Sequence, residues 1–338
     1  AWARRLVVSP HIGEMESPRS QQVVEQLVDE LPFLYGIEVA HYLCDAHPGY
    51  ASTRWAERQG LPFTGIWHHH AHAAALGAEF PEFWTSDSLV FTWDGVGLGP
   101  DQSLWGGEAL LGAAGNWQRY AHWRPFNVPG GDLAGRAPWR SAAALCWSGG
   151  EVFPQPEGIA DNDLRLLRGA WEKGINAPQT TAAGRLFDAA AALLGLAEQA
   201  SFEGQGPMWL EALAQDLPGT VVEVPVGVSP DSGSLQLDWL PLLRHMLNNE
   251  LSIEQRAADW HESMAMAILA LAEYGRRERG VEQVGFSGGV FQNRVLSERV
   301  IELLRQRGFD CLFPARVPVN DGGLCVGQVI EYLHQIKN

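Results

Sequence analysis

The order of apolar and polar segments predicts an α/β fold, with helices covering the faces of a sheet, for this chain of 338 residues. Short β-type runs such as LPFTGIW (61–67) and SLVFTWDG (88–95) alternate with longer segments of helical periodicity. The C-terminal part repeats a strand–turn–helix pattern twice, beginning at VEQVGFSGG and at CLFPARVPVNDGG. The length exceeds what one compact core usually holds, and it therefore predicts about two domains.

Each element is assigned from its own residues. Runs of β-branched and aromatic residues indicate strands, and apolar residues spaced three and four apart indicate helices. The N-terminal elements are expected in the order strand 3–9, helix 17–31, strand 37–45, helix 51–60, strand 61–67, a histidine-rich helix and strand 88–95. A segment rich in Gly, Pro and Trp, 115–140, is expected to cross between domains. Beyond it we expect helices in 161–174, 181–199 and 208–217, β-rich segments at 220–228 and 234–240, and a long helix near 254–279.

Composition and charge limit the class of protein. The net charge of −16 repels phosphate backbones, so a nucleic-acid partner is disfavoured. No apolar run reaches the ~20 residues of a membrane span, and no signal-peptide pattern opens the chain. The four scattered cysteines suit a reducing cytoplasm, where we expect the protein. Because the chain begins with Ala and enters a strand-like segment at once, we expect it to be a piece of a longer protein.

Histidines are concentrated in GIWHHHAHAAALG (65–77). His68 and His72 are four positions apart, so on a helix their rings share one face and can bind one ion, whereas His69 and His70 point elsewhere. Such a pair is often an ordinary surface or core pair. Here it directly follows a predicted strand, where α/β proteins place ligand sites, and we therefore expect metal binding. A further ligand is needed, usually a carboxylate.

Two carboxylates are candidates for this role. Asp94 ends a predicted strand, although an Asp-Gly hairpin turn would explain it equally well. Asp321 precedes the last helix, where a plain helix N-cap is the alternative. Both lie at strand-to-turn ends, like the histidines, and such ends can meet in one cleft.

Glycine-rich turns suggest an anion site. DGVGLG (94–99) and FSGGVFQN (286–293) follow predicted strands, and WGGE (105–108) and PGGD (129–132) add further glycines. Backbone N–H groups in such turns can bind phosphate, and a helix N-terminus adds its positive end. Each turn alone is common. The pattern is neither a P-loop nor G-x-G-x-x-G, which disfavours ordinary Walker ATPases and dinucleotide enzymes.

The joint pattern resembles a known family. The motifs HHHAHAA, WDGVGLG, LWGGE, RPFNVPGGD, GRLFDAAAALLGL, GFSGGVFQN and VNDGGL, with SPHIGEMES and CDAHPGYASTRWA, resemble the C-terminal transferase domain of HypF hydrogenase-maturation carbamoyltransferases. This domain is similar to TsaD-like transferases. The resemblance implies two RNase H-like lobes of the actin/Hsp70/sugar-kinase superfold with a cleft between them. The lobes would be 1–125, lacking the family's first strand, and 126–321, with helical insertions, and a final helix 322–338 would pack back on the first.

The resemblance also implies the site. An iron or zinc ion would be bound by His68, His72, Asp94 and Asp321, and magnesium would accompany the nucleotide. The nucleotide, ATP, AMP or carbamoyl-adenylate, would contact Gly95, Val96, Gly97, Gly106, Gly107, Glu108, Asp188, Gly204, Ser287, Gly288, Gly289 and Asn293.

The implied reaction is carbamoyl transfer from carbamoyl-adenylate to the C-terminal cysteine of HypE, with a YrdC-like domain upstream supplying the adenylate. The protein would then need no nucleophile of its own. Two alternatives stay open: an O-carbamoyltransferase acting on a small hydroxyl compound, and a nucleotide-binding docking module without activity. A tRNA-modifying transferase is opposed by the negative charge, and a kinase would leave the histidine pair without a role.

Overall fold

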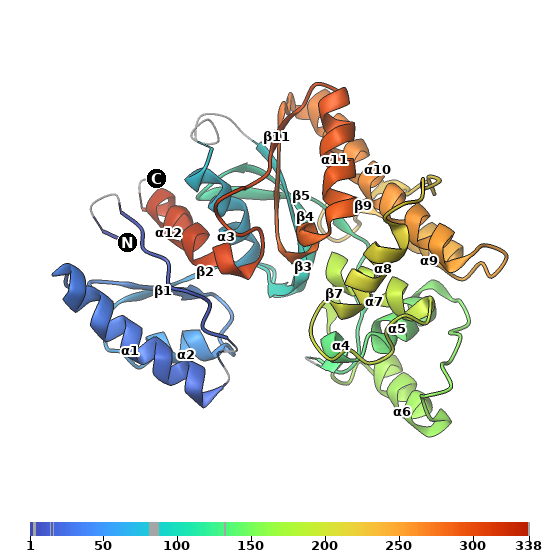
Figure 1. Cartoon of the computed structure of the whole chain (residues 1–338), viewed down its shortest axis with the longest axis horizontal. Coiled ribbons are helices and arrows are strands. Elements are labelled where there is room, and N and C mark those ends of the chain that lie inside the picture. The colour runs from blue at the N-terminus through green and yellow to red at the C-terminus, as the bar shows by residue number, and fades with distance from the viewer. Residues whose placement is uncertain (3–4, 14, 16, 81–87, 132, 337–338) are drawn as a thin grey trace.

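The computed structural model describes residues 1–2, 5–13, 15, 17–80, 88–131 and 133–336, and it confirms the predicted α/β class (Figure 1). The strands are β1 (Tyr42–Asp45), β2 (Phe63–Ile66), β3 (Ser88–Leu98), β4 (Leu104–Ala113), β5 (Asn116–Trp123), β6 (Phe126–Asn127), β7 (Gln179–Thr180), β8 (Val226–Val228), β9 (Leu235–Leu237), β10 (Gln283–Ser287) and β11 (Asp310–Leu312).

The α-helices surround these strands. They are α1 (Pro18–Tyr35), α2 (Ala51–Glu57), α3 (His68–Ala75), α4 (Leu133–Arg136), α5 (Trp139–Gly149), α6 (Asp161–Glu172), α7 (Ala183–Leu193), α8 (Gln205–Ala214), α9 (Leu240–Met246), α10 (Ile253–Arg279), α11 (Arg294–Gln306) and α12 (Leu324–Gln335). Short 3₁₀ helices at η1 (Leu76–Ala78), η3 (Gly289–Gln292) and η4 (Asp321–Gly323) join several of them. Within the described ranges, no helix has both the length and the apolar composition of a membrane-spanning segment.

The N-terminal part is built on a small parallel sheet of β1 and β2. The last helix, α12, lies beside α3 and contacts both strands of this sheet (Figure 1). The strand expected at 3–9 is wrong for its described residues, because Arg5 makes only an isolated bridge to Trp2 and residues 6–9 pair with no strand. Leu6, Val7 and Val8 are 40–48% exposed, so this apolar run has no sheet to join.

The larger sheet mixes parallel and antiparallel pairs. Its order is β11-β10-β3-β4-β5-β9-β8, and β6 and β7 pair beside β4. Strands β10, β11 and β3 are mutually parallel, whereas β3, β4 and β5 form an antiparallel meander. The expected lobe division at 125/126 falls between β5 and β6, both members of this sheet.

Strand β3 is buried on both faces up to the residue before Asp94. Its residues from Ser88 to Trp93 are all buried, because α3 covers one face of the strand while α7 and α10 cover the other. The Trp93 ring stacks on Phe291 with centroids 5.7 Å apart and lies 5.7 Å from the Trp123 ring. This packing fixes the part of β3 just before Asp94. Residues 94–98, expected as a turn, form the last part of β3, where the pairing with β4 shifts register between Trp93 and Gly97.

Helices α3 and α12 cross at a glycine. A Cβ on Gly327 would lie 1.8 Å from the Ala71 carbonyl oxygen, far inside van der Waals contact. Only a residue without a side chain therefore allows α12 to lie this close to the histidine helix.

Candidate metal and nucleotide site

The histidine helix presents two rings to one point. Trp67, in extended conformation, separates β2 from α3, so His68 occupies the first helical position and His72 lies one turn later. Their ring centroids are 4.9 Å apart. His68 Nε2 and His72 Nε2 lie 3.2 and 2.9 Å from the same oxygen of Asp94, Oδ2. The i, i+4 spacing thus produces the shared face that the sequence predicts.

Asp321 completes the group from a distant part of the chain. Its Oδ1 lies 3.2 Å from His72 Nε2 and 3.7 Å from His68 Nε2. One ligand atom from each of His68, His72, Asp94 and Asp321 lies within 4.8 Å of the other three. The histidine and Asp94 side chains are at most 14% exposed, whereas the Asp321 side chain is 68% exposed. The group is therefore a buried corner with one open side.

Other side chains orient the two rings. His68 Nδ1 lies 2.8 Å from Asp45 Oδ2, at the buried end of β1. His72 Nδ1 lies 3.3 Å from the Ser287 hydroxyl, whose oxygen is also 3.4 Å from the Val319 carbonyl. If each Nδ1 carries the proton, both Nε2 lone pairs face Asp94, which is the arrangement that metal-binding histidines use.

The electrostatics of the group favour positive charge. Burial lowers the pKa of His68, but hydrogen bonds to Asp45 and Asp94 and the charge of Asp321 outweigh it and hold the pKa well above its usual value. Burial likewise lowers the pKa of His72, and Asp321 and Asp94 raise it further than that. Burial raises the pKa of Asp94, yet the two histidines hold it well below its usual range. A metal cation between the rings and Asp94 would replace the protons on the two Nε2 atoms.

The donor set fits a transition-metal ion. Ligands bound tetrahedrally at ~2.1 Å lie ~3.4 Å from one another, and the distances between the histidine nitrogens and the aspartate oxygens are 2.9–3.7 Å. Two imidazoles with two carboxylates are the mixed donors that zinc and iron accept. Metal ligation by these residues remains a prediction.

Most of the predicted nucleotide-binding residues gather around Asp94. Its Oδ1 accepts hydrogen bonds from Gly95 N–H (2.8 Å) and Gly289 N–H (3.2 Å). Gly288 lies against the Trp93 carbonyl, with φ of 104°. Ser287, Gly288 and Gly289, at the end of β10, thus lie beside Asp94 in the neighbouring parallel strand β3, which also carries Gly95, Val96 and Gly97.

The tight packing explains several of these glycines. A Cβ on Gly97 would lie 2.7 Å from the His68 ring. Gly106 and Gly107 approach Ala182 and the Thr181 carbonyl at the start of α7, where a Cβ would lie 2.7 Å and 2.3 Å away. Close approach of neighbouring side-chain and backbone atoms is therefore a second reason for the glycines that the sequence assigned to phosphate.

Two of the predicted nucleotide-binding residues, Glu108 and Asn293, have hydrogen-bond partners within the protein. Glu108 is fully buried, and its oxygens accept from Gly106 N–H (3.2 Å), Gly107 N–H, the Thr181 hydroxyl and Arg119 Nε (2.6 Å). It therefore orders the Gly-Gly segment, and its contact with a nucleotide stays a prediction.

Asn293 is the second predicted nucleotide-binding residue whose side chain has partners within the protein. Its Oδ1 caps α11 by accepting from Leu296 N–H at 2.9 Å, and its amide nitrogen donates to His261 Nε2 at 2.8 Å. Both polar atoms therefore serve the fold, which an N-cap position before a helix explains.

Asp188 lies on α7 next to a buried arginine. Arg185 Nη1 is 2.5 Å from Asp188 Oδ2, and Nη2 is 3.5 Å from Glu203, which precedes Gly204. Burial raises the pKa of Asp188 to about 6, and Arg185 opposes that rise. A Cβ on Gly95 would lie 3.6 Å from Arg185 Nη2, so this pair adjoins the glycine-rich part of β3 that follows Asp94.

Sequence reasoning missed Asp45 and Arg185. Asp45 directly follows an apolar run in HYLCDAHPG, the same signal that identified Asp94. Arg185 is in GRLFD, one turn before Asp188. His69 was expected to point away from the pair, and its two ring nitrogens have no hydrogen-bond partner among the described residues. Burial, followed by the neighbouring histidines, lowers its pKa well below the usual value, so the ring is neutral.

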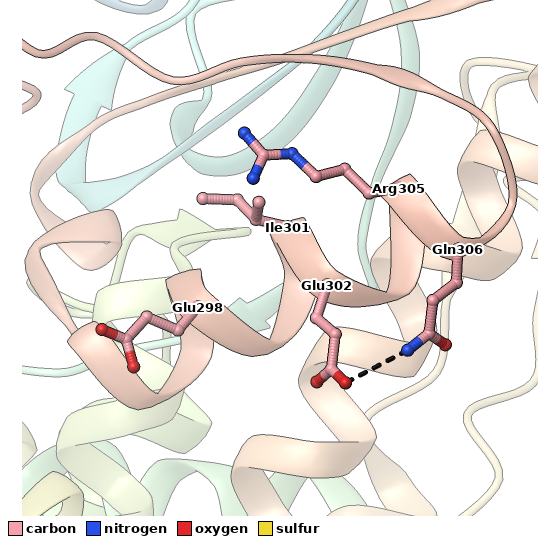
Figure 2. Close-up of a pocket in the computed structure, with 5 residues that line it drawn as sticks. All are labelled: Glu298, Ile301, Glu302, Arg305 and Gln306. Atoms are coloured by element: carbon pink, nitrogen blue, oxygen red, sulfur yellow. Dashed lines mark hydrogen bonds between the residues drawn. The ribbon is translucent and has the colours of Figure 1, made fainter.

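A hollow on α11 is separate from this site. Figure 2 shows its lining residues, Glu298, Ile301, Glu302, Arg305 and Gln306. They all come from one helix, and Glu302 already accepts a hydrogen bond from Gln306 at 3.1 Å. None of them belongs to the histidine–aspartate group.

Fold and site together define a mixed α/β protein of the actin/Hsp70/sugar-kinase type with a candidate His/Asp metal centre. Two family models match nearly the whole chain: the HypF Kae1-like domain over residues 1–79, and the second subdomain of the carbamoyltransferase Kae1-like domain over residues 90–328. The chain belongs to the HypF carbamoyltransferase family.

Individual relatives agree with this assignment. Carbamoyltransferase HypF of Synechocystis sp. is 35% identical over 344 residues, covering 96% of this chain and 44% of that protein. A carbamoyltransferase HypF homolog of Cupriavidus necator is 34% identical, covering 95% of this chain and 84% of that protein. The chain thus spans less than half of the first relative and most of the second.

Solved structures share the fold. The crystal structure of full-length HypF in the phosphate- and nucleotide-bound form matches with a TM-score of 0.87 at 27% identity, over 98% of this chain and 44% of that one. The crystal structure of T. kodakarensis HypF matches with a TM-score of 0.82 at 26% identity, over 96% of this chain and 45% of that one.

Proposed function

We propose that this chain transfers a carbamoyl group from carbamoyl-adenylate to the C-terminal cysteine of HypE, in the synthesis of the cyanide ligands of [NiFe]-hydrogenase. The observation that carries the proposal is the convergence of His68, His72, Asp94 and Asp321 next to the glycine-rich segments at Gly95 and Gly289. The names of the relatives, carbamoyltransferases, support the reaction class. The nucleotide-bound state of a solved HypF supports an adenylate as donor.

The metal centre would adjoin the leaving group. His68, His72, Asp94 and Asp321 would hold an iron or zinc ion, which would supply positive charge to stabilise the departing phosphate oxygen. Asp45 and Ser287 would keep the two rings in the ligating orientation. Asp188 would accept hydrogen bonds from the ribose hydroxyls, and magnesium would accompany the nucleotide phosphate.

The transfer balances without a nucleophile from this chain. The thiolate of the acceptor cysteine attacks the carbamoyl carbon, a C–S bond forms, and the C–O bond to phosphate breaks. AMP leaves with the electron pair, and the product is a thiocarboxamide. Ser287 contacts His72, but it is 2% exposed and also contacts the Val319 carbonyl, so it orients the ring rather than attacking substrate.

Mass spectrometry tests the proposal. The chain is incubated with HypE and carbamoyl-adenylate, or with a YrdC-like domain, carbamoyl phosphate and ATP. A carbamoyl adduct on the terminal cysteine of HypE is expected. It should disappear with His68→Ala and with Asp321→Asn, an exposed position where folding is little affected.

His70→Gln is the matched control, because His70 lies on the same helix but its Nδ1 faces Glu331 at 3.8 Å. Transfer that persists with His68→Ala in metal-free buffer would contradict the catalytic role and favour a docking module. Carbamoylation of small hydroxyl compounds with no adduct on HypE would favour an O-carbamoyltransferase.

A further inference from the structure

Glu79 connects the histidine helix to the loop that bears Asp321. It directly follows η1, which continues α3, and its own N–H donates to the Leu76 carbonyl at 3.0 Å. Its carboxylate accepts three consecutive backbone N–H groups from a segment more than 230 positions away: Ala315 at 3.1 Å, Arg316 at 2.8 Å and Val317 at 2.5 Å. Consecutive N–H groups around one anion form a compact and specific contact.

The anionic form of Glu79 makes this contact. Burial raises the pKa of Glu79, but the three N–H groups lower it by more and hold it below its usual value. Glu79 is therefore negatively charged at neutral pH when it accepts these N–H groups, and a neutral side chain would form weaker hydrogen bonds.

The loop runs back along the helix from Glu79 to the metal group. From His72 to Glu79 the chain advances about 12 Å, at ~1.5 Å per residue to the end of α3 and ~2.0 Å per residue through the 3₁₀ turn. From Val317 to Asp321 the chain advances four positions, at most ~13 Å when extended. A segment held by Glu79 at one end of the helix thus has just the length to place Asp321 next to His72.

Further contacts hold the loop nearer the site. The Val319 carbonyl accepts from Gly288 N–H at 2.7 Å, and Asn320 donates to Gln292 Oε1 at 2.9 Å. These contacts tie the loop to the end of β10 and to η3, whereas Glu79 ties it to the element that carries the histidines. Asp321 is the exposed member of the group, so its position depends most on how its backbone is held.

We infer that Glu79 is a positioning residue for the metal centre: it sets the distance between the histidine helix and Asp321 by anchoring residues 315–317. The inference rests on the proposed metal site and deepens it. Glu79 touches no ligand atom, so it acts only through the Asp321 loop. Groups that orient metal ligands in this indirect way typically change affinity 10- to 100-fold when removed.

A double-mutant cycle with Zn²⁺ alone tests the inference. Dissociation constants are measured for the wild type, Glu79→Ala, Asp321→Ala and the double variant, with Glu302→Ala, an exposed glutamate on α11, as the matched control. Glu79→Ala should weaken Zn²⁺ binding about 10- to 100-fold. In the Asp321→Ala background it should add less than about twofold, because its only route to the ion is gone.

Hydrogen exchange gives a readout that needs no metal. The amides of residues 315–317 should exchange faster in Glu79→Ala than in the wild type, and Glu79→Gln, which keeps one acceptor oxygen, should lie between them. Three results for Glu79→Ala would overturn the inference but not the metal centre: unchanged exchange of the amides of residues 315–317, unchanged Zn²⁺ affinity, or an equal loss of Zn²⁺ affinity with and without Asp321→Ala. A wild-type chain that binds no Zn²⁺ would overturn the metal centre and the inference with it.

Discussion

Replacing Asp45 by Asn should change which ring nitrogen of His68 carries the proton. In the structure His68 Nδ1 lies 2.8 Å from Asp45 Oδ2, while Asp45 Oδ1 accepts from His47 N–H at 2.8 Å. An Asn at this position can still accept from His47 N–H through its oxygen, but its amide group then donates toward His68. The neutral ring would carry its proton on Nε2, where the metal lone pair is needed.

The size of the effect follows from the burial of the pair. The side chains of His68 and Asp45 are 4% and 5% exposed, so water cannot replace the lost partner. A buried hydrogen bond to a charged group contributes about 1.5–3 kcal/mol. At ~1.4 kcal/mol for each factor of ten, Zn²⁺ affinity should fall about 10- to 100-fold.

Two measurements check this prediction. Competition with a chromophoric chelator gives the Zn²⁺ dissociation constant, and long-range ¹H–¹⁵N NMR identifies the protonated nitrogen of His68. Asp310→Asn is the matched control, because Asp310 pairs with Gln283, at the opposite end of β10 from Ser287. A Zn²⁺ affinity within about twofold of the wild type, or an Nδ1 that stays protonated in the Asn variant, would refute the reasoning.

Three further outcomes are expected. Because burial raises the pKa of Asp188 to about 6, its carboxylate loses charge as the pH falls through that value. Adenosine, which has no phosphate to titrate, should therefore bind more weakly at about pH 5 than at about pH 8. Asp188→Asn should remove most of this pH dependence, and an unchanged pH dependence in the variant would contradict the assignment of Asp188 to the nucleoside. Gly327→Ala should lower the free energy of unfolding in urea by at least about 1–3 kcal/mol, whereas Gly227→Ala, with nothing within 4 Å of its added Cβ, should change it little; equal effects would be inconsistent with the α3–α12 crossing. Zn²⁺ at about 100 times its dissociation constant should stabilise the wild type by about 2.7 kcal/mol, and EDTA should reverse this; a similar gain in Asp321→Ala would place the ion elsewhere.

Local patterns predicted the elements well where one stretch of sequence contains the whole signal. The helix expected near 254–279 is α10 (Ile253–Arg279), because its apolar spacing, its Ser252 N-cap and the Gly280 that ends it are adjacent in sequence. His68 and His72 share a face because helical geometry alone places them there. The strand expected at 3–9 is absent from its described residues, 5–9, since an apolar run forms a strand only where a neighbouring strand is available.

Contacts between distant segments could not be predicted in this way. Asp45 carries the same local signal as Asp94, but nothing in the sequence identifies His68, 23 positions away, as its partner. Glu79 contacts a segment more than 230 positions away, and no local pattern distinguishes it from an ordinary surface acid. The motif assigns Asn293 to the nucleotide, which stays a prediction, whereas the structure shows that its side chain caps α11 and donates to His261. A motif identifies the loop, whereas the packing around it decides which atoms remain available.

Anomalous diffraction from a crystal of this chain soaked in Zn²⁺ measures the central feature directly. The account predicts one peak about 2.0–2.2 Å from His68 Nε2, His72 Nε2 and an Asp94 oxygen, with Asp321 closing the open side. Rings that stay hydrogen-bonded to Asp94 with no density between them, while Zn²⁺ occupies other positions, would contradict it.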